Sequence, residues 1–403
     1  MGCCATKSSS RETLEFADKS SCCEKLVFAD KKYDFRIPAL LYFKEWNTFL
    51  AFAEKRTSTN DAHAMNLVMS KGTRDSGSLK WSPTEDVKEA AKDGYRTMNP
   101  CPVFERNSTG TGGGTLFLFF ICIKGKTPER KLKPGQTRLC YVTSTDLGVT
   151  WSDLTDLTES VNFTNYQTFA VGPGHGIQLS SGTLLVPAYV KEVEGCRQCQ
   201  SCWCCCGNSE YVSAHAVVLR SEDLNTWKAG QPIALESLEC QLAEVSDGKG
   251  GTQVYLNARS IGAPEPRVEA LSNDGGASFT RLNQLTLKER PHGCQGSVLG
   301  FPASDIPAGG GGSSETALLF SHPTKGEDWN RLDLGVYLRK SLQDDDPWGI
   351  PHIIHKGPSG YSDLTGCEEE RQFGCLMECG HGERLQIVFK EINHSDVDRG
   401  EAV

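Results

Sequence analysis

A turn motif of eight residues most constrains the fold of this chain. Ser144–Trp151 follows the pattern Ser-x-Asp-x-Gly-x-x-Trp, Ser272–Phe279 repeats it with Phe for Trp, and Ser221–Trp227 is a shorter copy without the glycine. In this pattern a short polar side chain bonds to its own backbone, the glycine takes a left-handed conformation and the aromatic ring packs on the sheet beneath. Turns that recur at about the length of one four-stranded sheet predict a β-propeller.

Strand-like runs occupy most of the remaining sequence. From Phe35 onward, short apolar, β-branched and aromatic runs alternate with clusters of Gly, Asn, Asp, Ser and Pro, which is typical of an all-β protein. We expect a flexible N-terminal tail over residues 1–32 and one propeller domain over residues 33–403. Leu116–Ile123 is apolar throughout, which predicts an inner strand buried on both faces. Arg36 heads the first apolar run and suggests that an anion is held at the centre of the propeller.

One segment carries two conflicting signals. Ser82-Pro83-Thr84-Glu85 is a capping box with proline at the first helical position, and Gly94 could close the helix. The surrounding pattern favours a strand and a turn instead. Both interpretations stay open, and we attach no function to the segment.

Charge and hydropathy exclude some partners and locations. The net charge of −9 argues against a nucleic-acid partner. The sequence has no apolar run of about 18 residues, so we expect no transmembrane helix. It starts without a basic and then apolar leader, so we expect no secretory signal.

The chain has 18 cysteines, a high number for a protein without a secretory signal. We expect no disulfide framework, because such frameworks belong to oxidising compartments. Several cysteines crowd a loop at residues 192–209. This loop could bind zinc through thiolates, could be acylated with Trp203 at the membrane interface, or could be an exposed loop with no fixed role. Eight others lie in apolar runs and are expected to act as small buried hydrophobes: Cys101, Cys122, Cys140, Cys240, Cys294, Cys367, Cys375 and Cys379.

The N-terminus carries a lipidation signal. Met1-Gly2-Cys3-Cys4-Ala5-Thr6 fits the pattern for myristoylation of Gly2. A single myristoyl chain binds membranes only marginally, so a second anchor is needed. Cys3 and Cys4 could supply it through palmitoylation. We therefore expect peripheral association with a membrane, at the plasma membrane or at endosomal membranes.

A series of motifs lies between the turns in one order along the chain. It comprises Tyr33–Pro38, Phe52–Arg56 with Asp61, Arg96–Pro102, Thr168–Gly176, Val186–Tyr189, Glu239–Gln241, Asn257–Ser260, Gly293–Ser297 and Gly360–Leu364. Together these motifs resemble animal exo-α-sialidases, from Phe35 to about Ile392. Phe119–Ile123, Pro291–Cys294 and Phe373–Cys379 most resemble the plasma-membrane, ganglioside-preferring type.

This resemblance implies a fold, an activity and a class of substrate. The fold is a six-bladed β-propeller with Asp-box turns. The activity is hydrolysis of terminal α-linked sialic acids from gangliosides, glycoproteins and oligosaccharides. No metal or organic cofactor is implied, because side chains supply the acid, the base, the nucleophile and the charge clamp.

The carboxylate of sialic acid explains why arginines are needed. The planar guanidinium donates paired hydrogen bonds and stays charged. By resemblance, Arg36, Arg259 and Arg331 form the triad that holds this carboxylate. Leaving one member of a buried charge pair alone costs about 2–5 kcal/mol, which is enough to cripple binding.

The same carboxylate accounts for the choice of nucleophile. A carboxylate nucleophile would be repelled by the anionic substrate, whereas a tyrosine is neutral until it loses its proton. By resemblance, Tyr361 is the nucleophile and Glu239 is the base that takes its proton. Asp61 protonates the departing glycosidic oxygen and later activates water, so the anomeric configuration is retained.

Other positions are carried over as substrate contacts. Glu54 is expected to hold a triad arginine by ion pairing, and Arg56 to contact polar substituents of the sugar. This chain has Lys191 where the family commonly has a second tyrosine, so glycerol-side contacts and linkage preference are not carried over. The expected apolar pocket for the acetyl methyl group comprises Met98, Ile121 and Leu238, and the expected hydrogen-bonding residues are Asn99, Glu129, Tyr189 and Gln295.

Two alternatives from other functional classes stay open. One is a sialic-acid-binding lectin that kept the arginines but lost turnover, although Tyr361, Glu239 and Asp61 are all present. The other is an Asp-box scaffold that contacts proteins through its blade edges. Such a scaffold would not bind sialosides and would be indifferent to Arg259→Ala.

Overall fold

The computed structural model is built almost wholly from β-strands. It describes residues 24–75, 77–107, 113–194, 211–246, 250–261, 265–282, 286–303, 315–342, 346–367, 371–380 and 386–399. The described helices are α1 (His394–Arg399) and the 3-10 turns η1 (Lys44–Trp46), η2 (Asp61–His63) and η3 (Glu129–Lys131). None of the helices in these ranges is long and apolar enough to cross a membrane. The predicted all-β class is confirmed.

Four sheets of four or five antiparallel strands follow one another along the chain. The first has β2 (Asp34–Phe43), β3 (Thr48–Arg56), β4 (Ala64–Asp75), β5 (Ser78–Trp81) and β6 (Glu85–Asp86), and the second has β7 (Tyr95–Arg106), β8 (Gly114–Lys124), β9 (Thr137–Ser144) and β10 (Thr155–Asp156). The third has β11 (Thr168–Val171), β12 (Ile177–Gln178), β13 (Leu184–Glu194), β14 (Tyr211–Ser221) and β15 (Lys228–Ala229). The fourth has β16 (Cys240–Ser246), β17 (Thr252–Ala258), β18 (Val268–Ser272) and β19 (Thr280–Arg281).

A fifth sheet has seven strands and joins the two ends of the described chain. Its order is β1-β25-β24-β23-β22-β21-β20. The strands are β1 (Lys25–Phe28), β20 (Ser297–Pro302), β21 (Thr316–Lys325), β22 (Leu332–Arg339), β23 (His352–Gly366), β24 (Gln372–Cys379) and β25 (Gln386–Asn393). The long strand β23 pairs with β22 as far as Pro358 and with β24 from Ser359 onward.

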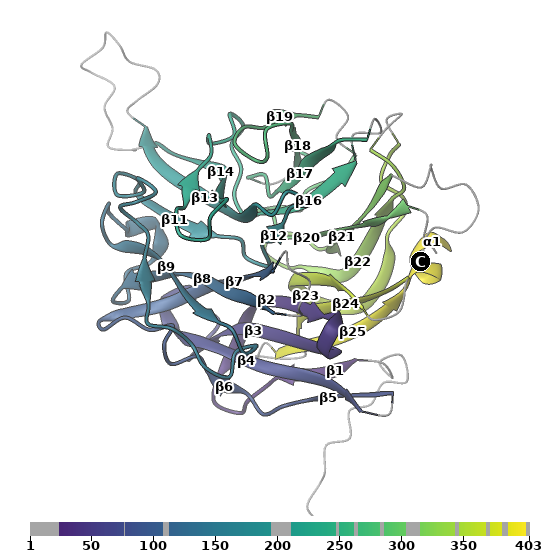
Figure 1. Cartoon of the computed structure of the whole chain (residues 1–403), viewed down its shortest axis with the longest axis horizontal. Coiled ribbons are helices and arrows are strands. Elements are labelled where there is room, and N and C mark those ends of the chain that lie inside the picture. The colour runs from purple at the N-terminus through teal and green to yellow at the C-terminus, as the bar shows by residue number, and fades with distance from the viewer. Residues whose placement is uncertain are drawn as a thin grey trace, which may run out of the picture.

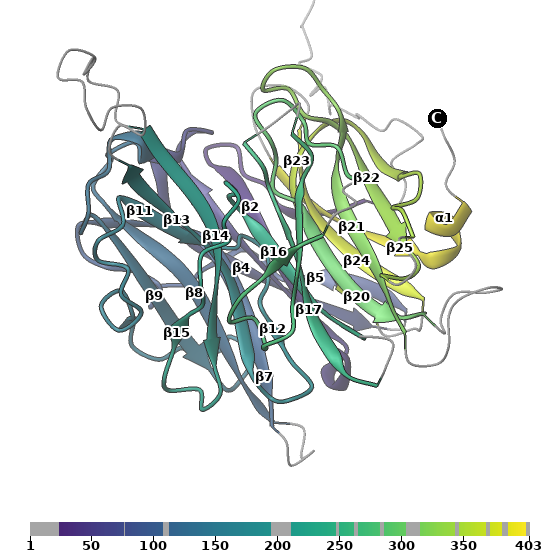
Figure 2. The same ribbon diagram turned by 90° about the horizontal axis from the view of Figure 1, so that it is seen from above.

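The sheets are arranged like the blades of a propeller. In Figure 1 the labels of β2, β7, β12, β16 and β20 lie toward the centre, whereas β5 and β19 lie at the edge. Figure 2, turned by 90°, shows neighbouring sheets side by side with their strands running across the molecule. One strand of each sheet therefore faces a shared centre.

Apolar residues fill the space between neighbouring sheets. Phe43 and Phe52 of the first sheet pack in one cluster with Phe120 of the second. Leu116–Ile123 lies within β8, and every residue of it is buried. This confirms the predicted inner strand, because the side chains on both faces of β8 meet protein.

The Asp-box turns directly follow β9, β14 and β18 and form the predicted internal hydrogen bonds. In the first, the Ser144 hydroxyl donates to Asp146 Oδ1 at 2.8 Å and accepts from the Gly148 N–H at 2.8 Å. Gly148 has φ +82°, and Ser272, Asp274 and Gly276 repeat the arrangement. Hydrogen bonds from Thr150 and Ser144 lower the pKa of Asp146 to about 2.

The structure changes one expected boundary, that of the N-terminal tail, and decides between helix and strand for the segment after Ser82. Part of the expected tail, Lys25–Phe28, forms β1 and pairs with β25, because Phe28 is fully buried there. The lipidation positions Gly2, Cys3 and Cys4 lie outside the described residues. The segment after Ser82 is a short strand and turns, because the Ser82 hydroxyl accepts from the Lys71 N–H of β4 at 2.9 Å.

The described cysteines are free thiols. Seven of them are buried and Cys367 is half-buried. Burial raises the pKa of most of these thiols, for example that of Cys240 to about 12. Most of the cysteine-rich loop, from residue 195 to residue 210, lies outside the described residues.

Candidate active site

A cavity of about 710 Å³ opens at the centre, where residues from several sheets converge. This volume is in the usual range for a small-molecule site. The wall combines charged groups with a few apolar ones. The predicted site residues that line it are Arg36, Arg56, Asp61, Met98, Asn99, Ile121, Glu129, Tyr189, Leu238, Glu239, Arg259, Arg331 and Tyr361.

Three arginines from distant parts of the chain surround one phenol. Arg36 lies in β2, Arg259 directly follows β17, and Arg331 directly precedes β22. Arg259 Nη1 lies 3.2 Å from the Tyr361 hydroxyl. The guanidinium carbons of Arg36 and Arg331 lie 5.3 and 5.4 Å from the centre of the Tyr361 ring. The three guanidiniums can therefore meet a single anion beside Tyr361.

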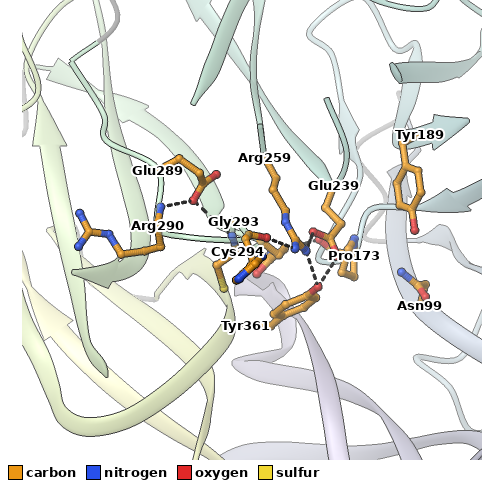
Figure 3. Close-up of polar contacts among 12 residues, drawn as sticks. Asn99, Pro173, Tyr189, Glu239, Arg259, Glu289, Arg290, Gly293, Cys294 and Tyr361 are labelled. Carbon is orange, nitrogen blue, oxygen red and sulfur yellow. Dashed lines mark hydrogen bonds and ion pairs between the residues drawn. The ribbon is translucent and has the colours of Figure 1, made fainter. Parts of the chain in front are cut away.

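Tyr361 and Glu239 form a hydrogen-bonded pair in the cavity. The Tyr361 hydroxyl donates to Glu239 Oε1, and Glu239 Oε2 accepts from Arg259 Nη1 at 2.7 Å. Figure 3 shows these three side chains converging. Burial, followed by the charge of Glu239, raises the pKa of Tyr361 well above its ordinary value. Burial alone would raise the pKa of Glu239 too, but the charge of Arg259 and the bond from Tyr361 hold it below its ordinary value.

Asp61 stands at the mouth of the cavity beside two cations. Its Oδ1 lies 2.5 Å from Arg56 Nη1 and 3.7 Å from Arg36 Nη1. Burial would raise its pKa, but the charges of Arg56 and Arg36 overcome this effect and lower it. The carboxylate is half-exposed, which leaves it open to a ligand and to water.

Glu54 has a different partner from the one expected. We expected it to pair with a triad arginine, but its Oε2 bonds to Arg56 at 2.5 Å and its Oε1 accepts from the Asn99 N–H at 2.6 Å. Glu54 and Arg56 are both fully buried and lie two residues apart on one face of β3. Glu54 therefore fixes Arg56, which in turn holds Asp61.

Sequence reasoning missed Glu378 as a site residue. Its Oε1 accepts from Arg36 Nε at 3.1 Å and from the Ile37 N–H at 2.8 Å, and its Oε2 accepts from the Tyr361 N–H at 3.1 Å. Ile37 has φ +60°, a strained conformation for a β-branched residue, and the register of β2 shifts there. One carboxylate thus fixes a triad arginine and the backbone of the candidate nucleophile. A lone acidic residue in the apolar run 375–379 was the signal that could have revealed it.

One side of the cavity combines apolar and polar side chains, as expected for a wall that contacts acetamido and glycerol groups. Met98 and Ile121 face each other across β7 and β8, and Asn99 has φ +58° at a register shift beside them. The Tyr189 hydroxyl lies 3.3 Å from Glu129 Oε1, and Lys191 Nζ lies 2.8 Å from the same oxygen. Lys191, at the place of the family's second tyrosine, therefore adds an ion pair to this wall.

Gln295, like Glu54, is a predicted contact that does not line the cavity. Its amide donates to the carbonyls of Pro173 and Ser362 at 3.2 and 3.0 Å, and its side-chain oxygen accepts from the Ser362 N–H at 3.1 Å. The side chain is buried and is not among the lining residues. Gln295 therefore supports the backbone next to Tyr361.

The arrangement offers acid–base and nucleophilic chemistry next to an anion clamp. A phenol within bonding reach of a carboxylate can lose its proton as it attacks. A separate carboxylate at the mouth can give a proton to a leaving oxygen. Among the residues that the structure describes, no group of three or more His, Cys, Asp or Glu side chains could hold a metal ion.

Comparisons with known proteins identify relatives of the chain. The family model described as BNR repeat-like domain matches residues 47–375. Sialidase-3 of Homo sapiens is 40% identical over 91% of both chains, and Sialidase-2 of Mus musculus is 42% identical over 88% of this chain and 91% of its own.

Solved structures support the fold. The Hadza microbial sialidase Hz136 has a TM-score of 0.68 at 20% identity, over 90% of this chain and 66% of its own. The Trypanosoma rangeli sialidase in complex with the inhibitor DANA has a TM-score of 0.66 at 17% identity, over 89% of this chain and 55% of its own. This chain thus spans about two thirds of the first structure and about half of the second.

Proposed function

The chain belongs to the sialidase family, which makes it a glycoside hydrolase, and on this premise we propose that it is an exo-α-sialidase acting with retention through Tyr361. The substrates are terminal α-linked sialic acids on glycoconjugates. One observation carries the proposal: three guanidiniums and a phenol paired with a carboxylate line one cavity. The chemistry of an anionic sugar requires this combination.

The propeller in this proposal has six blades. Four are the sheets of four or five strands. The seven-stranded sheet counts as two, because β23 changes partner from β22 to β24 near Pro358. One blade then contains β20–β22 with the start of β23, and the other contains the rest of β23 with β24, β25 and β1.

Arg36, Arg259 and Arg331 hold the substrate carboxylate in this mechanism. The anomeric carbon next to that carboxylate then lies beside the Tyr361 oxygen. Asp61 Oδ1 is near enough to Arg36 to reach the glycosidic oxygen of the same substrate. Bringing an anion to Arg36 offsets part of its positive charge, which raises the pKa of Asp61 and favours its acid form.

Two displacements at the anomeric carbon account for retention. In the first, the Tyr361 oxygen forms a bond to this carbon, its proton goes to Glu239, and the bond to the leaving oxygen breaks as Asp61 protonates it. In the second, Asp61 takes a proton from water, the water oxygen bonds to the carbon, and the Tyr361 oxygen leaves and regains its proton from Glu239. The raised pKa of Tyr361 explains why a partner base is needed.

The opposite wall recognises the rest of the sugar. Met98, Ile121 and Leu238 are suited to the acetyl methyl group, and Asn99, Tyr189 and Glu129 to polar substituents. Lys191 and Glu129 form a charged edge that we assign to the glycerol side. In this scheme Gln295 does not touch the sugar and holds the backbone of Ser362, next to Tyr361.

Gangliosides are the substrates that we favour among sialoglycoconjugates. The N-terminal Gly2-Cys3-Cys4 would hold the enzyme at a membrane, where lipid-linked glycans reach a high local concentration. We expect Gly2→Ala to move the protein from the membrane pellet to the soluble fraction. An unchanged distribution would place the anchor elsewhere in the chain.

The central test compares two phenols in the same cavity. We expect the purified protein to release sialic acid from a fluorogenic sialoside at acidic pH. Tyr361→Phe should lose most of this turnover and keep its affinity for a sialic acid ligand, because the arginines remain. Tyr189→Phe is the matched control: because Tyr189 is assigned to substrate contact and not to the displacement, this variant should keep kcat and change only KM.

Two outcomes would contradict the proposal. A wild-type protein that binds the ligand without turnover would be a lectin. A protein that ignores sialosides, and whose properties do not change in Arg259→Ala, would be a scaffold.

A further inference from the structure

The loop Glu289–Cys294 touches two members of the arginine triad through its backbone. Arg259 Nη2 donates to the carbonyl of His292, and Arg331 Nη2 donates to the carbonyl of Gly293 at 2.8 Å. Figure 3 shows Gly293 and Cys294 beside the end of Arg259, with Glu289 on the far side of the loop. Two neighbouring carbonyls thus direct two guanidiniums that come from different sheets.

Gly293 is in direct contact with Arg259. Its φ is +66°, and a Cβ at this position would lie 2.6 Å from Arg259 Nε and 2.9 Å from the Ser260 carbonyl oxygen. His292 also has a positive φ, +59°, and its ring stacks on Trp329 at 4.0 Å with an angle of 2° between the planes. The loop conformation is therefore matched closely to the side chain of Arg259 and to the segment that leads to Arg331.

Glu289 closes this loop from behind. Its Oε1 accepts from the N–H groups of Arg290 and Cys294 at 2.9 and 3.3 Å. Its Oε2 accepts from Arg267 Nη1 at 2.8 Å, and the same nitrogen donates to the Cys294 carbonyl at 2.7 Å. Both ends of the loop therefore depend on one buried ion pair.

The ion pair is isolated from solvent and stays charged. Glu289 and Arg267 are both fully buried. Burial alone would raise the pKa of Glu289, but the charges of Arg267 and His322 lower it to about 2. Arg267 Nε also donates to Asn257 Oδ1 at 2.6 Å, so the pair is tied to β17, the strand that ends just before Arg259.

The end of the loop reaches the candidate nucleophile as well. Cys294 is fully buried in a small apolar cluster with Ile37 and Tyr361. The loop thus borders Arg259, Arg331 and Tyr361, yet Glu289 itself does not line the cavity.

We propose that Glu289 is a positioning residue, which shapes the 290–294 loop so that its carbonyls aim Arg259 and Arg331 at the substrate carboxylate. This inference rests on the proposed function, because it assumes that the two arginines bind that carboxylate. Without the Glu289 carboxylate, the loop N–H groups and Arg267 lose their shared acceptor. The carbonyls of His292 and Gly293 then no longer fix the two guanidiniums.

The test measures recognition of a carboxylate rather than activity alone. The probes are 2,3-didehydro sialic acid and its methyl ester, and the measurement is the ratio of their dissociation constants at one pH. For Glu289→Gln we expect affinity for the acid to fall by about 10–100-fold, as for residues that orient metal ligands from behind. Affinity for the ester should change much less, so the ratio should shrink.

Glu269→Gln is the matched control. Glu269 is also a buried carboxylate paired with an arginine, Arg339, and it also accepts from the Trp348 ring and the Tyr255 hydroxyl. These partners all lie outside the loop at residues 290–294. We expect this variant to lose thermal stability and to keep the ratio of acid to ester affinity.

The outcomes separate this inference from the proposed function. If the wild type does not prefer the acid, or if Arg259→Ala keeps the preference, the proposed function is wrong. If Arg259→Ala loses the preference while folded Glu289→Gln keeps it, only the role of Glu289 is wrong. If Glu289→Gln does not fold, Gly293→Ala provides the test, because its methyl group displaces Arg259. A folded Gly293→Ala protein with an unchanged ratio would overturn the inference.

Discussion

The Asp-box turns at Ser144, Ser221 and Ser272, called the rim below, and the cavity at the centre use similar side chains in opposite ways. In the turn at Ser144, the hydrogen bonds join residues two to four positions apart. At the centre, the bond from Arg36 to Glu378 spans 342 positions, and the bond from Tyr361 to Glu239 spans 122. A rim turn is therefore complete within its own motif, whereas the centre exists only when the whole domain is assembled.

The carboxylates of the two regions also reach low pKa values by different means. Hydrogen bonds from neighbouring groups lower the pKa of Asp146 and Asp223 to about 2 in exposed turns. Glu239 is buried, and burial alone would raise its pKa, but the charge of Arg259 and the hydrogen bond from Tyr361 together outweigh burial and lower it. We therefore expect changes at the rim to alter stability and changes at the centre to alter chemistry.

The largest effect on kcat/KM among these variants should come from Asp61→Asn, which removes the carboxyl group that acts as the acid. Asp61→Asn cannot protonate a leaving oxygen, and general acid catalysis contributes about 10²–10⁴-fold to the rate. The loss of kcat/KM should be large with a natural sialoside and much smaller with an activated aryl sialoside, whose leaving group needs no proton. Kinetics with both substrates measure the difference.

The pH profile provides the control for this prediction. The pKa of Asp61 in the free enzyme lies below 3.8, so the acid form is lost as pH rises through that low value. The wild-type kcat/KM should therefore fall as pH rises toward neutrality, and this fall should be absent in Asp61→Asn. Equal losses on both substrates would contradict the assignment of Asp61 as the acid.

Trp227→Ala tests the rim. Trp227 is buried at the end of the turn Ser221–Trp227, and its ring meets the ring of Phe119 edge-on, with 4.7 Å between centroids and 70° between planes. Removing a buried Trp side chain costs about 3–5 kcal/mol, so the free energy of unfolding should fall by that amount. The kcat/KM of the folded protein should not change.

Denaturant unfolding and active-site titration measure the two quantities separately. Val149→Ala is the control, because Val149 lies in another turn and is 71% exposed. It should change stability by less than about 0.5 kcal/mol. A loss of kcat/KM in folded Trp227→Ala would show that rim and centre are coupled.

Glu378→Ala tests the coupling within the centre. It leaves Arg36 without its buried partner, which costs about 2–5 kcal/mol. That corresponds to about 30–5,000-fold in kcat/KM. Because one carboxylate serves Arg36 and the backbone of Tyr361, the double variant with Arg36→Ala should lose little more than either single variant.

A second double-mutant cycle, which pairs Glu378→Ala with a change outside the centre, serves as the comparison. The effects of Glu378→Ala and Trp227→Ala, measured as kcat/KM and stability, should add, because the two residues share no contact. Additive losses for Glu378→Ala and Arg36→Ala would contradict the shared role of that carboxylate.

The contrast between rim and centre also explains what the sequence could reveal. The Asp-box turns are local, so spacing and residue type alone predicted their hydrogen bonds and the all-β class. The strand Leu116–Ile123 was predictable because its burial on both faces leaves a continuous apolar run. The catalytic residues were assigned through resemblance, because no local pattern brings Arg36, Arg259 and Arg331 together.

The errors have the same origin. Glu54 was assigned to a triad arginine, but its partner is Arg56, two positions away on the same face of β3. Glu378 was missed because its partners, Arg36 and Ile37, come from the other end of the chain. β1 was taken for tail because four residues carry little pattern until β25 pairs with them. Partner identity across a propeller is set by assembly rather than by spacing.

The smallest effect should come from neutralising one turn carboxylate. Asp146→Asn keeps the shape of the side chain but weakens the bonds from Thr150 and Ser144. The pKa of Asp146 is about 2 in the folded protein against an ordinary 3.8, so its stabilising charge is fully present above about pH 4 and is lost as pH falls toward 2. Thermal unfolding should therefore show a lower midpoint for Asp146→Asn at pH 7 and a smaller gap to the wild type near pH 2.

Asp153→Asn removes a nearby exposed charge outside the turn and controls for net charge. A gap between Asp146→Asn and the wild type that stays constant with pH would mean that the charge of Asp146 does not support the turn. The rim would then depend on shape alone, whereas at the centre the carboxylate of Glu378 still accepts from the backbone of Ile37 and Tyr361.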